Sequence, residues 1–296
     1  MSHSGGVTAF FFRPPEELRR YFTTFYCVEF SADEVSDHFD YLHPEWANMR
    51  IVNGGKLVAE NRSGTQVGET GFFFTGPSSQ AVRFGFDRAF RMWGIGVLPL
   101  GWAKFFRTDA ALWADVLVDG HDDAALTEFS DLAKGLFRGP ADHEAELERI
   151  CAFFLDRQHL PVVDEARILA IHSALVDPEV DSVAALVERA GISQRTLIRV
   201  CQRAFGFSPK LLLRRQRFLR SLAKYVLDPS LKWIGALDSQ YHDQAQFVRD
   251  FKQFMGMSPR QYGLLDKPIL TAVMRERARF AGKAVQGLDT PAGGGS

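Results

Sequence analysis

Two short stretches of this 296-residue sequence place arginine and glutamine at helical spacing, in a pattern suited to reading DNA bases. As a helix, the first stretch presents one outward face: Arg195, Ile198, Arg199 and Gln202. The second presents Gln244, Gln246, Arg249 and Lys252. Arginine can bridge O6 and N7 of guanine, and glutamine can bridge N6 and N7 of adenine, so both faces suit the major groove. For Arg199 and Arg249, an ion pair with a neighbouring helix is the alternative role.

The two stretches belong to a repeated unit. When residues 193–209 are aligned with 243–259, five of the 17 positions are identical, whereas about one match is expected at average residue usage. The identical pairs are Gln194/Gln244, Arg199/Arg249, Gly206/Gly256, Ser208/Ser258 and Pro209/Pro259. A sequence that recurs in this way indicates one supersecondary element that is used twice.

Each unit is predicted to be a helix–turn–helix. In the first unit, Gly191 ends a helix over 183–190 and Ser193 caps the next, which runs to about residue 204. Asp243 is the corresponding cap in the second unit. A joining helix over 210–227 would be about 27 Å long, shorter than the ~34 Å between successive major-groove faces. The spacing therefore predicts reading of adjacent turns with modest DNA bending, or with one helix seated less deeply.

Charge is distributed unevenly along the chain. Residues 1–180 hold 16 Lys and Arg against 27 Asp and Glu, whereas residues 181–262 hold 14 against 6. The stretch 193–224 carries nine basic residues and no acidic one, which favours a nucleic-acid partner. Within it, Arg215 is predicted to contact phosphate. The alternative is a basic helix face exposed only to solvent.

These motifs resemble a known family. The segment DQAQFVRDFKQFMGMSPRQY (243–262) is similar to the signature DQxxFxRxFKxxxGxSPxxY of the AraC/XylS transcription regulators, and 191–209 resembles the first unit of the same domain. Over residues 164–262 the resemblance implies a seven-helix DNA-binding domain. It also implies double-stranded promoter or operator DNA and RNA polymerase as partners, with a separate sensing or dimerisation domain. Activation and repression both stay open.

One position departs from the family pattern. Gln240 stands where the family usually has glycine, just before Tyr241. If that position needs a positive φ, glutamine costs about 1 kcal/mol relative to glycine. The sequence therefore predicts backbone strain at Gln240.

The N-terminal region has a different character. Strand-like runs at 21–30, 49–52, 71–75, 81–86 and 89–97 alternate with turn signals. Together with its Pro, Gly and His-Pro motifs they resemble a cupin-like sensory domain, so the expected fold class is α+β, with a cupin-like β-barrel, a helical connector and an all-α C-terminal domain. Its many aromatic residues either fill the core or line a pocket for a small-molecule effector.

The expected domains are therefore 1–121 (sensory), 122–163 (connector), 164–262 (DNA-binding) and 263–296 (a tail, partly disordered at its Gly-rich end). Over residues 122–176, which span the connector and the start of the DNA-binding domain, Pro140 and Pro161 separate three helices. The apolar face of 144–155 either forms a homodimer interface or docks on the β domain.

Other functions receive little support from the sequence. His38 and His43 do not complete a convincing metal-ligand set, Cys151 lies among helical apolar residues, and no motif of a hydrolase, P-loop enzyme or dinucleotide-binding enzyme is present. We therefore expect no enzyme activity, metal or cofactor. The absence of a signal peptide or a long apolar run favours a cytoplasmic protein that does not enter the membrane. The family resemblance implies a bacterial protein. The alternative is a cupin-type metalloenzyme with a DNA-targeting domain.

Overall fold

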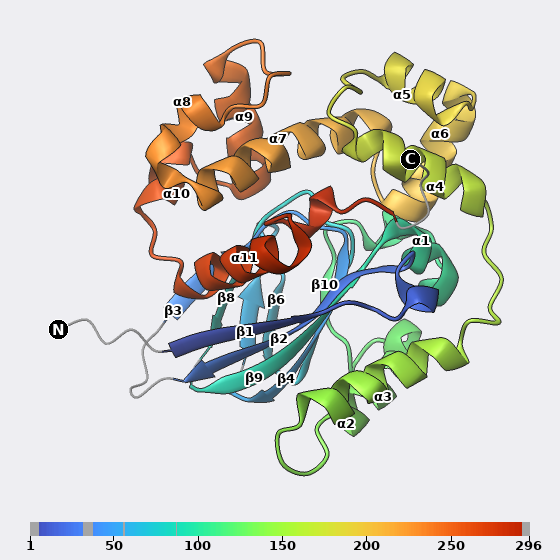
Figure 1. The fold of residues 1–296 in the computed structure, drawn as a ribbon, viewed down its shortest axis with the longest axis vertical. Coiled ribbons are helices and arrows are strands. Elements are labelled where there is room, and N and C mark those ends of the chain that lie inside the picture. Colours follow the sequence, from blue (N-terminus) through green and yellow to red (C-terminus); the bar gives the residue numbers. More distant parts are fainter. Residues whose placement is uncertain (1–5, 32–37, 56, 87, 292–296) are drawn as a thin grey trace.

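The computed structural model describes residues 6–31, 38–55, 57–86 and 88–291 (Figure 1). The N-terminal half forms two antiparallel sheets, one with the strand order β1-β2-β9-β4-β7-β10 and one with the order β3-β8-β5-β6. The strands are β1 (Gly6–Phe12), β2 (Phe22–Ser31), β3 (His38–Leu42), β4 (Ala47–Gly54), β5 (Leu57–Glu60), β6 (Gln66–Thr70), β7 (Phe72–Thr75), β8 (Val82–Phe86), β9 (Phe90–Val97) and β10 (Leu117–Asp119).

The six-stranded sheet is buried on both faces. On β9, Met92 points into a core shared with the smaller sheet, whereas Trp93 and Ile95 point into a second core formed with the helices. A strand buried on both sides needs apolar residues at every position, which is why β2, β7 and β9 are recognisable from sequence as continuous apolar runs. The less apolar strands β3, β5 and β6, and the amino-terminal strand β1, were not predicted.

The predicted α+β fold class is confirmed, but the β-barrel is not closed. Among the described strands, β1 ends one sheet and β3 ends the other, and they do not pair with each other. Helix α11 (Pro268–Ala281) packs against both of these edge strands, where a closed barrel would bring them together (Figure 1). The tail therefore contains a docked helix that the sequence did not lead us to expect. Of the end predicted to be disordered, only Pro291 lies within the described residues.

Residues 122–176 form the three expected helices: α2 (Thr127–Leu136) and α3 (His143–Asp156) in the connector, and α4 (Glu165–Val176) after it. Ile150 and Phe154 of α3 are fully buried against the six-stranded sheet. Glu146 of the same face accepts hydrogen bonds from Arg91 Nη2 at 2.5 Å and from Trp93 Nε1 at 2.6 Å, both on β9. Of the two uses predicted for this helix face, docking on the β domain is therefore the one that the structure shows.

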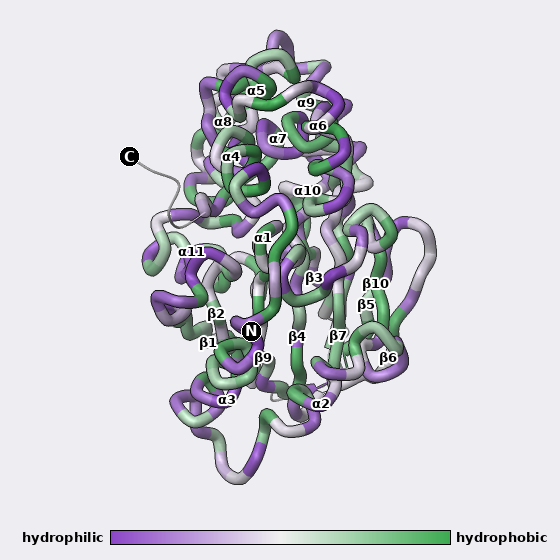
Figure 2. Tube along the Cα trace, turned by 90° about the vertical axis from the view of Figure 1, so that its right-hand side faces the viewer, coloured by the Kyte–Doolittle hydropathy of each residue, from purple (hydrophilic) through white to green (hydrophobic). Residues whose placement is uncertain are grey.

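The helical half lies at the opposite end of the β domain from α2 and α3 (Figures 1 and 2). Its long helix α7 joins a group formed by α5 and α6 to a group formed by α8, α9 and α10. The bounds are α5 (Val183–Ala190), α6 (Gln194–Val200, continued by a π-helical turn over Cys201–Phe205), α7 (Pro209–Leu227), α8 (Lys232–Ala236), α9 (Gln244–Met255) and α10 (Pro259–Leu264). No helix in the described parts of the chain combines the length and the apolar character needed to cross a membrane.

Candidate nucleic-acid interface

The first candidate reading helix is α6 with its π-helical continuation. Gly191 ends α5 at a φ of +64°, and Ser193 Oγ accepts a hydrogen bond from Thr196 N at 3.3 Å, which caps α6. Leu197 and Val200 face the core. The predicted reading side chains lie together on the exposed face: Arg195, Ile198, Arg199 and Gln202. The capping residues in the sequence were therefore enough to predict which face of this helix is exposed.

The second candidate reading helix, α9, is built in the same way. Asp243 caps it by accepting a hydrogen bond from Gln246 N at 2.5 Å, and Gly256 ends it at a φ of +75°. Its inner face carries Phe247, Phe251 and Phe254, all buried. Gln244, Arg249 and Lys252 are exposed, and Gln246 is partly buried because its Oε1 accepts a hydrogen bond from His242 N at 3.2 Å.

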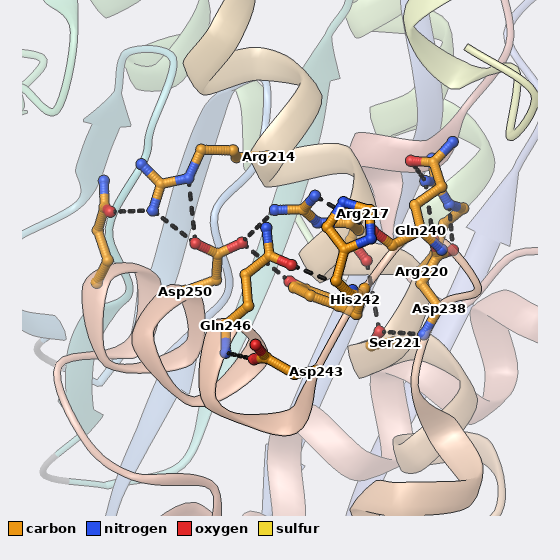
Figure 3. Close-up of polar contacts among 12 residues, drawn as sticks. Arg214, Arg217, Arg220, Ser221, Asp238, Gln240, His242, Asp243, Gln246 and Asp250 are labelled. Carbon is orange, nitrogen blue, oxygen red and sulfur yellow. Dashed lines mark hydrogen bonds and ion pairs between the residues drawn. The ribbon is translucent and has the colours of Figure 1, made fainter. Parts of the chain in front are cut away.

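A buried carboxylate fixes the angle between α9 and α7. Asp250 is 2% exposed and accepts hydrogen bonds from Arg214 at 2.5 Å, Arg217 at 2.9 Å and the Tyr241 hydroxyl at 3.1 Å (Figure 3). Burial raises the pKa of the Tyr241 hydroxyl, so Tyr241 donates its proton to Asp250. The two arginines, which the sequence placed in a free basic stretch, are thus structural contacts of the second unit.

Gln240 joins the two units and is not strained. Its φ is not positive, so the prediction of backbone strain is wrong. The Asp238 side chain accepts a hydrogen bond from Gln240 N at 3.1 Å and so forms the turn without a left-handed residue. The Gln240 side chain accepts a hydrogen bond from Arg220 at 2.8 Å (Figure 3). It also donates to Pro178 O at 2.5 Å, in the loop that precedes the first unit.

Arg199 has a partner within the protein. Its Nη1 lies 2.9 Å from Oδ2 of Asp164, the residue before α4, which also accepts from Arg167. The hydrogen bond from Arg199 holds the pKa of Asp164 below its usual value. The alternative role predicted for Arg199, an ion pair with a neighbouring helix, therefore exists in this conformation. Among the described residues, Arg195, Arg249 and Lys252 have no side-chain partner.

These features can be compared with known proteins. Residues 186–263 match the family model of a helix-turn-helix domain. The C-terminal region is an AraC-type helix–turn–helix domain. The chain is accordingly a DNA-binding transcription regulator, which confirms the function expected from the sequence resemblance. No curated protein matches the chain.

Solved structures resemble the chain only distantly. ToxT from Vibrio cholerae O395, bound to (E)-4-(8-methylnaphthalen-1-yl)but-3-enoic acid, is 12% identical over 78% of this chain and 95% of its own, with a TM-score of 0.43. ToxT from Vibrio cholerae in a P21 crystal form is 11% identical over 88% of this chain and 98% of its own, also with a TM-score of 0.43. The AraC-like transcriptional activator CuxR is 14% identical over 74% of this chain and 87% of its own, with a TM-score of 0.30. The assignment of the AraC-type domain rests on the family match, not on these likenesses.

The position of Arg215 contradicts its predicted contact with phosphate. Arg215 is fully buried where α7 meets the β domain, and it donates hydrogen bonds to Glu45 O at 3.2 Å and Ser78 O at 2.9 Å. Its guanidinium also lies 4.1 Å from the centre of the Trp46 ring. Burial lowers the pKa of Arg215 to about 9. Arg215 therefore fastens the AraC-type domain to the β domain and is not accessible to DNA.

The β domain also contacts both reading units. Arg62, in the turn between β5 and β6, donates to Gln253 O at 2.6 Å near the end of α9. In the first unit, a Cβ on Gly206 would lie 3.1 Å from Ala110 O and 3.2 Å from Pro77 Cβ. The close approach at Gly206 leaves no room for a larger residue, so glycine serves here both the left-handed turn and the contact.

One of the two histidines considered as metal ligands is engaged within the protein. His43 is buried, its Nε2 lies 2.7 Å from the Tyr262 hydroxyl, and burial lowers its pKa to about 3. The side chain of His38 lies outside the described residues. Cys151 is a free thiol, partly buried on α3, and burial raises its pKa to about 11, which makes it a poor nucleophile.

Proposed function

We propose that both units bind one operator in double-stranded DNA, with α6 and α9 in successive major-groove segments. The observation that carries this proposal is the pair of like-capped helices with exposed reading faces, joined by the 19 residues of α7. At 1.5 Å per residue, α7 spans about 28 Å, less than the ~34 Å of one DNA turn. Simultaneous binding therefore needs modest DNA bending, or one reading helix seated less deeply.

We assign base contacts to the side chains on these two faces. In the first unit they are Arg195, Ile198, Gln202 and, once it is released from Asp164, Arg199. In the second they are Gln244, Gln246, Arg249 and Lys252. A bidentate arginine contact with guanine contributes about 1–3 kcal/mol of discrimination, so a few such contacts are enough to specify an operator.

A small-molecule effector would enter the gap between the two sheets beneath α11. A cavity of about 80 Å³ lies there, with apolar walls that include Phe11, Leu42 and Met274, and with the polar side chains of Arg50 and Gln286. Few polar groups in an apolar cavity are typical of ligand sites, but such sites usually measure ~300–1,000 Å³. In this proposal, binding of an effector moves α11 and the segment after it.

Other parts of the assignment extend the same reasoning. We propose that the chain divides at about residues 121, 163 and 262, that it functions in the cytoplasm without enzyme activity, and that RNA polymerase is its partner at the promoter. If the protein forms a homodimer, it uses a surface other than the apolar face of α3, because that face is buried on the sheet.

The experiment is a binding titration of the full-length protein on an operator obtained by genome-wide DNA binding. Arg195→Ala and Arg249→Ala should each weaken operator binding by about 1–3 kcal/mol and random-sequence binding by much less. Arg279→Ala is the matched control, because Arg279 is exposed on α11 and pairs with Glu276 of the same helix. Equal losses on operator and random DNA would show that these arginines contact phosphate only.

A further inference from the structure

A cluster of three potential metal ligands lies on the side of the molecule away from the reading helices. Cys27 and Glu29 are two residues apart on β2 and therefore point to the same face of the sheet. His143 is the first residue of α3, which packs on that face. One donor atom from each residue lies within 4.8 Å of the other two, and His143 Nε2 is 2.9 Å from Glu29 Oε1.

The surroundings leave this cluster closed on one side and open on the other. Phe10 and Trp93 are the neighbours of Cys27 on the adjacent strands, and the His143 ring lies 4.6 Å from the Phe10 ring. Cys27 is fully buried beneath them. The side chains of His143 and Glu29 are 24% and 40% exposed, and His143 borders a surface hollow that also includes Phe10. An ion can therefore approach from solvent while the thiol side stays dry.

The local charge favours a cation. Glu29 and Glu146 lie near the Cys27 thiol, and because Arg91 pairs with Glu146, the Glu29 carboxylate supplies the remaining negative charge. A cysteine thiol has an ordinary pKa of about 8.5, so without a bound cation it carries its proton at neutral pH. A bound divalent ion changes this, because metals bind the thiolate and displace its proton.

We propose that Cys27, Glu29 and His143 form a binding site for one divalent transition-metal ion, with Zn²⁺ as the best match. Thiolate, imidazole and carboxylate are all zinc ligands, and three protein ligands leave a fourth position for water or another molecule. Binding releases the Cys27 proton to solvent. In the ion-free protein His143 Nε2 donates to Glu29; on binding, that proton passes to solvent while Nδ1 holds a proton, and the freed Nε2 lone pair binds the ion. Because the ion replaces the His143–Glu29 hydrogen bond, it ties the start of α3 to β2 more firmly.

This site differs from the cupin-type site that the histidines 38 and 43 suggested, because it lies on the outer face of the six-stranded sheet, under the connector. It is also independent of DNA binding. A metal bound here would set the position of α3 on the β domain.

The test uses Co²⁺ as a spectroscopic probe on the full-length protein after it has been stripped with a chelator. We expect one Co²⁺ per chain, with a thiolate-to-cobalt charge-transfer band that Zn²⁺ abolishes by displacement. Cys27→Ser should lose the band, whereas Cys151→Ser, the matched control on α3, should keep it. Glu29→Gln is conservative at a partly exposed position and should weaken Zn²⁺ affinity at least about tenfold while the protein stays folded by circular dichroism.

Two results would overturn the proposal. One is that the stripped wild-type protein binds neither Co²⁺ nor Zn²⁺ at micromolar concentration, in which case His143 and Glu29 only hold α3 in place. The other is a charge-transfer band that survives in Cys27→Ser, or Zn²⁺ affinity that Glu29→Gln leaves unchanged.

Discussion

The ion pair between Asp164 and Arg199 competes with DNA for a reading side chain, so we expect its removal to strengthen operator binding. The change is Asp164→Asn, which removes the charge and keeps the shape. Asp164 has a φ of +62°, and asparagine is among the few residues that tolerate this left-handed conformation. The backbone before α4 should therefore be unaffected.

The magnitude follows from exposure. The Arg199 side chain is 45% exposed and that of Asp164 is 11% exposed, so the pair belongs with the exposed ion pairs that contribute about 0.2–1 kcal/mol. Arg199 gives up this energy when it turns to a base. Removing the Asp164 charge means that this energy is no longer lost on binding. Because 1.4 kcal/mol corresponds to a factor of ten, a gain of at most about 1 kcal/mol should raise operator affinity at most about fivefold. The gain should shrink at high salt, because salt weakens the competing pair.

The assay is fluorescence anisotropy of a labelled operator duplex with the full-length protein at fixed salt. Asp177→Asn is the matched control. Asp177 pairs with Arg189 of α5, so this substitution removes the same charge without changing a contact of a reading helix. Asp164→Asn should gain more than Asp177→Asn, and the gain should vanish when Arg199→Ala is also present. If both substitutions strengthen binding equally, or if the gain survives in Arg199→Ala, the reasoning is refuted.

Three further predictions concern stability. Asp250→Asn removes a buried carboxylate from two partly buried arginines and should lower the free energy of unfolding by about 3 kcal/mol, measured in urea; a loss below about 1 kcal/mol would contradict the structural role. Deleting residues 266–296 uncovers the gap between the sheets and should increase binding of a hydrophobic dye, whereas an undocked tail predicts no change. Burial lowers the pKa values of His43 and His172 to about 3 and raises the pKa of Asp40 to about 6. Between about pH 4 and 6, the unfolded state therefore binds two more protons at the histidines, and the folded state binds one more at Asp40. Together these three groups contribute a loss of about 1.4 kcal/mol per unit fall in pH, testable by urea unfolding at several pH values, and His172→Gln should largely remove this contribution.

The helix–turn–helix units were predictable because their signals are local. The predicted bounds of α5 agree with the structure, and Gly191, Ser193 and Asp243 cap the helices as expected. Each of these contacts joins residues at most three or four positions apart, so a single sequence contains all the information needed.

The pairing of the basic residues was not predictable in the same way. Residues 193–224 contain no acid, yet Arg199, Arg214 and Arg220 each find an aspartate from another segment: Asp164, Asp250 and Asp238. A charge count along the chain cannot detect partners that only the fold brings near. The place of α11 was missed for the same reason, because its partner strands lie more than 200 residues earlier.

Arg215 is different, because the sequence did contain a signal. It lies at helical spacing with Leu212, Leu219 and Leu222, all of which are fully buried, so the 3.6-residue period places it on the inner face of α7. The charge of the side chain outweighed its position in the prediction. The periodicity of a helix is the better guide to burial when a buried arginine can donate to backbone carbonyls, as Arg215 does.

The β domain contacts the helix–turn–helix part of the chain at three separate places, so it touches both helix–turn–helix units and the helix α7 between them. Arg62 contacts the end of α9, Pro77 and Ala110 pack at the end of the first reading helix, and Arg215 anchors α7 between them. Because α7 sets the spacing of the two units and each unit also touches the β domain, the spacing depends on the β domain as well as on α7. We therefore expect a shift of the sheets beneath α11 to reach both candidate reading helices through these direct contacts.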